Sequence, residues 1–272
     1  MIGTGSFATD GIFASGATTA YILIVVFAFG LVFGSFLNCM AWRIAHNESV
    51  LKGRSHCAVC GHVLGAADLV PVFSYLFLKG KCRYCGKKIS PRYMIAELVC
   101  GALFVIAVLK WGISFETLRY VVLFAILFTL SLVDIEISII PDRFIIAAIV
   151  WWVLTLPLMH ESVVSQLKSG LIGAFVIAGA MLLMSLLFDK ISGKESMGGG
   201  DIKLYFVCGL YLGPLRGFLC IILSCILGLL AAALLGKNRD EPFPFGPAIA
   251  VSCVICLLFG QYAVDWYLGF LK

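Results

Sequence analysis

The chain has 272 residues, of which 61% are hydrophobic and 13% charged, and its formal net charge is +5. Its mean hydropathy is +1.05. Because a soluble domain carries about 25% charged residues, this composition excludes a soluble globular protein and predicts a polytopic membrane protein.

The N-terminal region carries no lysine or arginine before Arg43 and only one acid, Asp10. A secretory signal peptide starts with a basic segment, which is missing here. We therefore interpret residues 1–17 as a short translocated tail and residues 18–42 as the first membrane helix.

Residues 43–92 form the largest polar insertion and contain the pattern CxxCG twice, with 21 residues between Cys60 of the first copy and Cys82 of the second. Each copy can direct two thiolates at one tetrahedral Zn²⁺, and its glycine permits the tight turn that follows. The reducing cytoplasm disfavours disulfides, so we predict a structural zinc site without His56 or His62; the alternative is four free thiols. The predicted ligands are Cys57, Cys60, Cys82 and Cys85.

Seven further apolar segments follow the insertion, and each approaches the length of about 20 residues that a membrane-spanning helix needs. The sixth and seventh spans of the chain meet at Gly213-Pro214. The fold class predicted is an all-α membrane protein of about eight helices, with residues 93–272 as its main membrane core. The seven segments are 93–110, 118–136, 142–160, 168–188, 201–213, 216–236 and 247–270.

The positive charges set the expected orientation. With both termini outside, fifteen of the twenty Lys and Arg residues lie on the cytoplasmic side and five outside. Cytoplasmic loops carry such an excess of positive charge. The cysteine-bearing insertion is therefore predicted to be cytoplasmic.

Two carboxylates reach the same depth in this orientation, because Asp134 ends the inward-running third span and Asp201 starts the outward-running sixth. Paired aspartates can share a proton, with one as general base on water and the other as general acid. Glycines before Asp201 allow close backbone approach; the alternative is a flexible loop with a helix-starting aspartate. The expected active-site loop contains Gly198, Gly199, Gly200 and Lys203.

Three further acids are candidate accessory residues. Glu136 could join the site or face water. Asp142 precedes an apolar run and is expected to cap the fourth helix. Glu97 lies about one turn into the second span, where it should face a polar partner such as Arg43 or Asn38, or extend to the interface.

One more cysteine pair, Cys253 and Cys256, also has CxxC spacing. It lies within an apolar span and has no second pair beside it in sequence. A thiol in such a segment behaves as a small hydrophobe, so we interpret this pair as packing.

Taken together, these motifs resemble the type IV prepilin peptidases, which are leader peptidases and N-methyltransferases of pilus and type II secretion systems. The resemblance extends from about residue 30 to nearly the end of the chain, with the motifs in the order of the family. Ala58 and Met94 depart from it, since proline is common at both positions. The matching stretches are Gly34 to Asn38 with Arg43, Asp68 to Pro71, Ser74 to Leu76, Arg92-Tyr93, Glu97-Leu98, Asp134, Ile140 to Asp142, Met197 to Leu204 and Pro244 to Pro247.

The resemblance implies a membrane aspartyl protease of the GxGD class in the bacterial cytoplasmic (inner) membrane, with Asp134 and Asp201 as catalytic residues. Its substrates would be prepilins and pseudopilins, cut at the cytoplasmic face after a basic leader, and no nucleic acid is expected as a partner. It also implies methylation of the new N-terminus with S-adenosylmethionine. The acids expected to attract the basic leader are Glu136, Asp142, Asp189 and Glu195.

Two other classes of function are alternatives. In a transporter or channel, Asp134 and Asp201 would line a proton or cation path, but the central parts of the predicted spans are almost free of charge. A zinc-anchored membrane adaptor without catalysis would account for the cysteines but not for two carboxylates at one depth. The sequence gives no oligomeric state.

Overall fold

The structure is a computed structural model that describes residues 16–50, 52–193, 197–235 and 243–270. In this part of the chain the regular structure is helical, with two isolated β-bridges. The chain divides into two compact units, Met1–Ala125 and Ile126–Lys272, and their boundary falls within helix α5. Most of the predicted N-terminal tail, and Glu195, lie outside the described residues.

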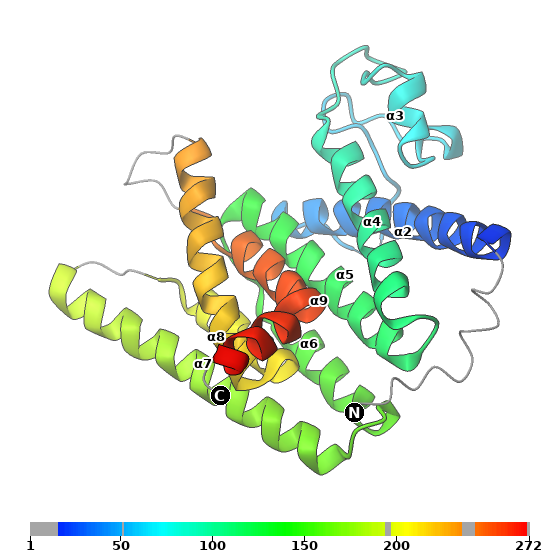
Figure 1. Ribbon diagram of the computed structural model, residues 1–272. Helices are drawn as coiled ribbons and strands as arrows, with labels where there is room; N and C mark the ends of the chain where they lie inside the picture. The colour runs from blue at the N-terminus through cyan, green and yellow to red at the C-terminus, as the bar shows by residue number, and fades with distance from the viewer. Residues whose placement is uncertain (1–15, 51, 194–196, 236–242, 271–272) are drawn as a thin grey trace. The chain divides into compact units, whose positions relative to one another are not determined.

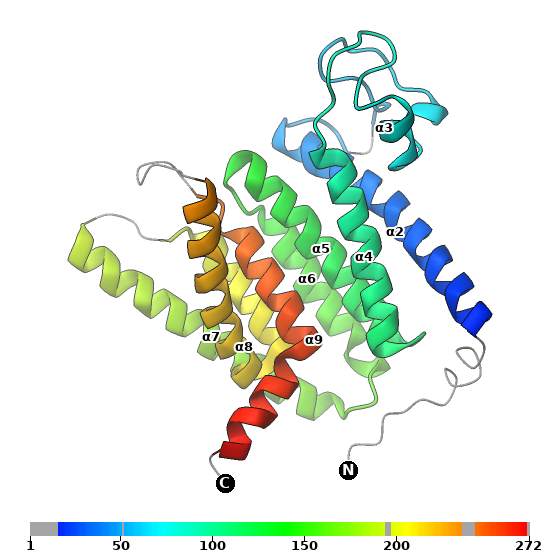
Figure 2. The same cartoon turned by 45° about the horizontal axis from the view of Figure 1, so that its top comes forward.

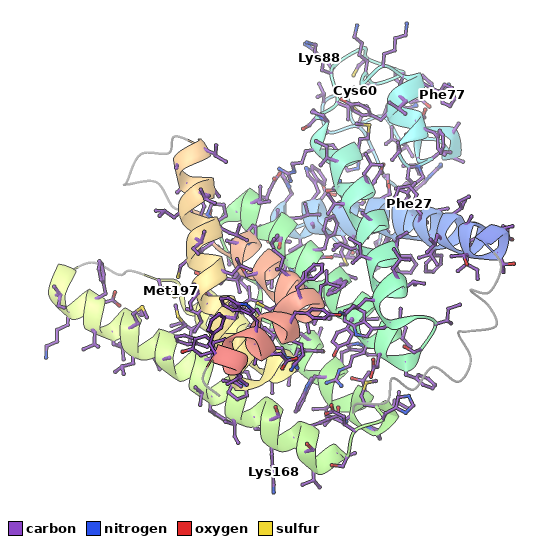
Figure 3. All side chains as sticks on the ribbon, viewed as in Figure 1. Phe27, Cys60, Phe77, Lys88, Lys168 and Met197 are labelled. Atoms are coloured by element: carbon purple, nitrogen blue, oxygen red, sulfur yellow. The ribbon has the colours of Figure 1, made fainter. Side chains whose placement is uncertain are left out.

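The first unit is built on two packed helices, α2 (Gly16–Ala45) and α4 (Arg92–Trp111) (Figure 1). They approach closely because glycines face each other: a Cβ on Gly30 would lie 2.7 Å from the Cα of Gly101. The ring of Phe27, labelled in Figure 3, would be only 2.8 Å from a Cβ on Gly101. Small residues of this kind allow membrane helices to pack backbone to backbone.

The insertion between these helices contains two short helical elements, η1 (Ala66–Asp68) and α3 (Phe73–Phe77). The first unit then continues into α5 (Phe115–Ile137) as far as Ala125. A turn at Gly112, which has φ +66°, separates α4 from α5. Glycine suits this position because residues with a Cβ rarely adopt positive φ.

The second unit contains the rest of α5 and the remaining helices, among which α8 packs on α7 and on α9 (Figure 2). The helix after α5 starts directly behind Pro141. Proline has a fixed φ and no N–H to leave unpaired, so it suits a helix start. The elements are α6 (Asp142–Thr155), η2 (Leu156–Leu158), α7 (Val163–Ser192), α8 (Gly199–Leu235) and α9 (Gly246–Phe270).

Helix α8 folds back on itself at Gly213, where φ is 72° and ψ is −178°. The Tyr205 hydroxyl lies 2.5 Å from the Ser224 hydroxyl oxygen, although these residues would be about 28 Å apart along a straight helix. Pro214 cannot continue the hydrogen-bond ladder of the first segment. Residues 199–212 and 214–235 are therefore two antiparallel segments, in agreement with the predicted boundary.

The packing of α7 on α8 leaves no room for side chains at several glycines. A Cβ on Gly209 would lie 2.6 Å from backbone atoms of Ala174, and a Cβ on Gly173 would lie 2.5 Å from the carbonyl oxygen of Gly209. This close approach holds the α8 hairpin against α7, so that dispersion contacts replace the hydrophobic driving force that is missing in lipid.

Among the described residues, six helices are long and apolar enough to cross a membrane. One of them is α8, which consists of two segments. Helix α6 is not among the six, since its 14 residues extend only about 21 Å. When the two segments of α8 and the shorter α6 are counted separately, the described helices are consistent with about eight membrane helices. The structure therefore confirms the predicted all-α polytopic fold.

The reversal at Gly213 generates a stability prediction. The change Gly213→Ala should lower the apparent melting temperature in detergent, equivalent to about 1–3 kcal/mol. The alanine would adopt positive φ, and its Cβ would lie 2.8 Å from the Ser169 hydroxyl oxygen. Thermal unfolding followed by circular dichroism measures the effect.

The matched control is Gly179→Ala within α7, because a Cβ there meets nothing within 4 Å and alanine favours a helix. This control should melt at the wild-type temperature or above it. If Gly213→Ala melted like the control, the reversal would not depend on glycine.

Candidate active site and metal centre

Asp134 lies in the last turn of α5 and is 3% exposed. Its Oδ2 accepts a hydrogen bond of 2.9 Å from the backbone N–H of Gly246, the first residue of α9. The first N–H groups of a helix have no partner within the helix, so the start of α9 has a donor to offer. A partial positive charge at a helix N-terminus also favours an anion.

Gly246 fits this position because it has no side chain. A Cβ there would lie 2.8 Å from Oδ2 of Asp134 and 3.3 Å from Cδ1 of Ile140. Pro247 follows and has no N–H, so Gly246 supplies the donor at this point. The sequence of Pro244 to Pro247 predicted no role for Gly246, although a glycine followed by proline at the start of a helix was the available signal.

Asp201 lies in the first turn of α8 and is partly buried. Its carboxylate is close enough to Asp134 for electrostatic interaction. The structure therefore brings the two predicted aspartates together within the second unit. Two carboxylates that interact in this way disfavour the state in which both are ionised.

The three glycines before Asp201 differ in how much space a side chain would have. A Cβ on Gly200 would lie 2.9 Å from Cβ of Ile140, a Cβ on Gly198 would lie 3.6 Å from Oδ2 of Asp201, and Gly199 has open space. None of the three has positive φ. The expected loop is thus largely helical from Gly199 onward, and Gly200 serves close packing rather than an unusual backbone conformation.

Lys203 and Asp142 form an ion pair with 2.6 Å between Nζ and Oδ1. It joins the first turn of α8 to the first turn of α6, and both side chains are more than half exposed. An exposed pair of this kind contributes little stability. The expectation that Asp142 caps α6 is wrong, because Pro141 is the N-cap and Asp142 is the first helical residue.

Glu136 also lies in the last turn of α5, two positions after Asp134. Residues separated by two positions do not face each other on a helix. The structure therefore turns Glu136 away from the side of α5 that carries Asp134. Asp189 lies near the end of α7.

The two CxxCG segments fold alike. In each, the glycine has φ +69°, and its N–H bonds to the first cysteine's carbonyl, from Gly61 to Cys57 and from Gly86 to Cys82. Positive φ at both positions accounts for glycine. The ligand atoms all lie within 4.8 Å of one another, so this group could hold a metal ion, and they belong to Cys57, Cys60, Cys82 and Cys85.

The histidines next to these cysteines make contacts of their own. The ring of His62 packs on Tyr84, with 3.6 Å between centroids. His56 packs edge-on against Trp42 and lies 3.9 Å from Glu48. Neither belongs to the metal-ligand group found among the described residues.

Asp68 connects the spacer to the second cysteine segment. Its carboxylate accepts three hydrogen bonds: one of 2.6 Å from Arg83 Nε, one of 3.1 Å from the Tyr84 hydroxyl and one of 3.1 Å from the Gly65 N–H. Burial of Asp68 raises its pKa, but the hydrogen bonds from Arg83, Gly65 and Tyr84 outweigh this effect and bring the pKa below its usual value. The ionised carboxylate therefore holds the second cysteine segment in position through Arg83 and Tyr84.

Glu97 is buried on α4 in the first unit, with partners that the sequence did not indicate. Its Oε2 accepts a hydrogen bond of 2.7 Å from the N–H of Val72, and the Ser35 hydroxyl also bonds to the carboxylate. The suggested partner Arg43 instead donates to carbonyl oxygens of residues 49–53. Asn38, the other suggested partner, is not among the described residues that bond to Glu97.

The second CxxC pair has thiol neighbours that are distant in sequence. Cys208 lies near Cys253 and Cys220, and Cys220 lies near Cys256. All four are at most 1% exposed. Among the described residues they do not form a group compact enough to count as a metal site, in keeping with packing.

Comparison with known proteins identifies the family. The sequence model of the type IV leader peptidase family matches residues 121–233, and that of the bacterial peptidase A24 N-terminal domain matches residues 28–111. No solved structure is significantly similar to the chain.

Curated relatives named prepilin leader peptidase/N-methyltransferase match most of the chain. The protein of Bacillus subtilis is 35% identical, over 91% of this chain and 98% of its own length. Those of Dichelobacter nodosus and Neisseria gonorrhoeae are 32% and 30% identical, over 85% and 88% of this chain and 90% and 92% of their own lengths. This multi-pass membrane protein therefore belongs to the type IV leader peptidase family.

Proposed function

We propose that this enzyme removes the basic leader from type IV prepilins and pseudopilins with Asp134 and Asp201, and then methylates the new N-terminus with S-adenosylmethionine. The names of the curated relatives combine these two activities. The observation that carries the peptidase proposal is that Gly200, next to Asp201, and Gly246, which bonds to Asp134, both pack against Ile140, so that the two aspartates interact electrostatically. A transporter or a non-catalytic adaptor is not favoured by these relatives.

The pair acts by general acid–base chemistry. One carboxylate removes a proton from water as its oxygen attacks the scissile carbonyl carbon, and the other donates a proton as the amine leaves and the C–N bond breaks. The hydrogen bond from Gly246 fixes one of the two carboxylates. Lys203 belongs to the same first turn of α8 as Asp201, but its charge is paired with Asp142.

The proposed setting is the bacterial cytoplasmic membrane, with both termini outside and cleavage at the cytoplasmic face. The distribution of Lys and Arg supports this orientation. Residues 43–92 then form the cytoplasmic insertion and residues 93–272 the membrane core. The acids proposed to attract the basic leader include Asp142, but its ion pair with Lys203 weakens that contribution.

The metal proposed for the four cysteines is Zn²⁺ in a structural role. Thiolate ligands in a tetrahedral arrangement suit zinc. An insertion of this size has little core of its own, so a bound metal would supply much of its folding free energy. The positive-φ glycines and the Asp68 contacts support a site that is already shaped for one ion.

The first prediction from the proposed function concerns the aspartates. Each of Asp134→Asn and Asp201→Asn should reduce cleavage of a purified prepilin by at least about 100-fold, because asparagine keeps the size of the side chain but cannot transfer the proton. Asp265→Asn, near the opposite end of α9 from Gly246, is the control and should cleave normally. Full activity of either test variant would mean that another acid, Glu136 or Asp142, does this chemistry.

A second prediction concerns Gly246. The change Gly246→Ala should lower kcat by about 10-fold to 100-fold with a smaller change in KM, because the methyl group would displace Asp134. The pH profile of cleavage should also change, which a merely structural effect would not produce. Gly269→Ala, where a Cβ meets nothing within 4 Å, is the control; wild-type kcat and pH profile in Gly246→Ala would refute the positioning role.

A third prediction concerns the metal. Purified protein should contain about one zinc ion per chain by elemental analysis, and Cys57→Ser with Cys82→Ser should lose it and melt at a lower temperature. Cys253→Ala with Cys256→Ala is the control and should retain the metal. Zinc retention in the first double variant would exclude the four-cysteine site.

A further inference from the structure

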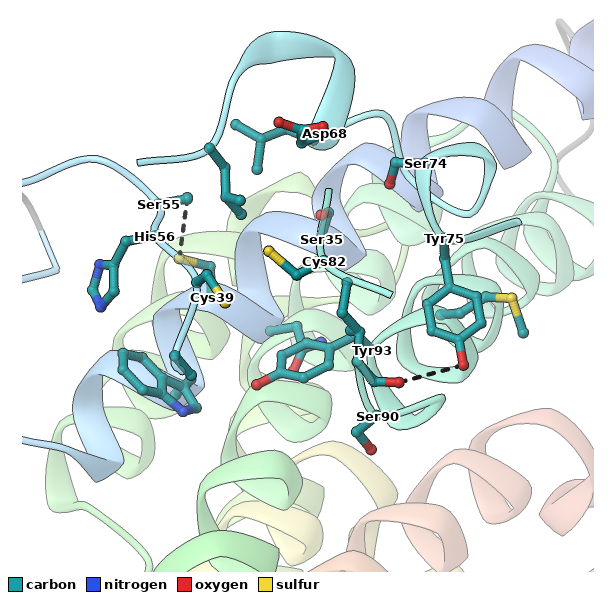
Figure 4. A pocket seen from close by; sticks show the side chains of 18 of the residues that line it. Ser35, Cys39, Ser55, His56, Asp68, Ser74, Tyr75, Cys82, Ser90 and Tyr93 are labelled. Carbon is teal, nitrogen blue, oxygen red and sulfur yellow. Dashed lines mark hydrogen bonds between the residues drawn. The ribbon is translucent and has the colours of Figure 1, made fainter. Parts of the chain in front are cut away.

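Helix α3, in the insertion of the first unit, has two different faces. On one face, Tyr75 lines a cavity of about 650 Å³ between the insertion and helices α2 and α4, and its hydroxyl donates over 3.5 Å to the Ile89 carbonyl oxygen (Figure 4). Phe73, Leu76 and Phe77 have the i, i+3, i+4 spacing of one other side of the helix. With two residues that precede the helix, they form an apolar face whose side chains are 43% to 83% exposed: Leu69, Val70, Phe73, Leu76 and Phe77.

A hydrogen bond fixes the depth of this apolar face along α4. The Val72 N–H donates to Glu97 Oε2 over 2.7 Å, and Glu97 lies five residues after Arg92, where α4 begins, which is about 7.5 Å along the helix. Because α4 has 20 residues, enough to span the hydrocarbon core, its start marks the edge of that core. The exposed Ile95 and Val99 of α4 lie at the same level. The apolar face is therefore placed at the boundary between headgroups and acyl chains.

The insertion is also strongly basic, with nine Lys and Arg residues against two acids. Lys81 and Lys88 lie opposite each other in an antiparallel bridge. With Lys79 they line a hollow of about 410 Å³ that also includes Pro91, the residue before α4. All three lysines are exposed, and none forms an ion pair with a residue that the structure describes. These charges thus lie at the level of the lipid headgroups.

The combination of the two features indicates the partner. Figure 3 shows Phe77 and Lys88 on the outer surface of the insertion. An exposed apolar patch marks a contact with a protein or a membrane, and apolar side chains flanked by lysines beside a membrane helix are typical of contact with anionic lipid. The leader of the proposed prepilin substrate is itself basic, so like charges disfavour that occupant.

We propose that α3 lies in the membrane–water interface and that this surface of the insertion binds anionic phospholipids. The apolar face enters the boundary of the acyl chains, and Lys79, Lys81 and Lys88 bind the lipid phosphate groups. The insertion is then attached to the membrane surface along α3, in addition to its connections to α2 and α4. This inference does not rest on the proposed cleavage or methylation.

The lysines are tested by native mass spectrometry of the full-length protein in detergent, titrated with phosphatidylglycerol. Lys81→Gln with Lys88→Gln should raise the Kd of this lipid by at least about 10-fold. Lys52→Gln with Arg54→Gln is the charge-matched control, because both residues are exposed in the same insertion but do not line the hollow; its Kd should stay near that of the wild type. Equal weakening in both double variants would mean general charge attraction and would overturn the site. Displacement of the lipid by inorganic phosphate would also overturn it.

The apolar face is tested in vesicles made of equal parts of phosphatidylcholine and phosphatidylglycerol. The photoreactive residue p-benzoylphenylalanine in place of Phe77 should form a phospholipid adduct, detected by the mass of the full-length protein. The same residue in place of Val59, an exposed apolar position in the first cysteine segment, is the control and should form little. Equal adducts at both positions, or crosslinks from position 77 to a second copy or to added prepilin instead of lipid, would overturn the proposal. Neither measurement uses enzymatic activity, so the outcome is separate from that of the proposed function.

Discussion

The hydrogen bond from Gly246 to Asp134 is the contact on which the second unit's candidate site depends. A carboxylate enclosed by apolar helices needs a donor, and the first turn of α9 has one that no helical carbonyl uses. The same contact requires glycine, because a methyl group would overlap the carboxylate. The position of α9 is therefore linked directly to the orientation of Asp134.

Asp201 reaches the same place by a different route. It opens a segment that reverses at Gly213 and is held to α7 by contacts that tolerate no side chain at Gly173 or Gly209. Close packing of this kind does not tolerate even an added methyl group. The first segment of α8, which Asp201 opens, is therefore held in one position against α7. Gly200, pressed against Ile140, completes this arrangement. The separation of the aspartates is thus set by backbone contacts over much of the unit.

The two aspartates proposed for peptide hydrolysis lie in the unit that starts at Ile126. A cavity of about 650 Å³ lies in the other unit, which ends at Ala125. Cys57 and Cys82 of the cysteine segments line this cavity. A structural metal bound to them would therefore also hold part of the cavity wall in place.

The sequence alone determined the features that depend on local pattern. Apolar segments of membrane-spanning length indicated the helices, and Gly213-Pro214 indicated the division of α8, because both signals lie within a few residues of the structure they specify. The CxxCG repeats likewise predicted two tight turns that bring four thiols together. The tertiary structure decided the partners: Gly246 for Asp134, Val72 and Ser35 for Glu97, and Cys208 and Cys220 for the second cysteine pair. These contacts join residues far apart in the chain, and only the packing of helices and insertion brings them within bonding distance.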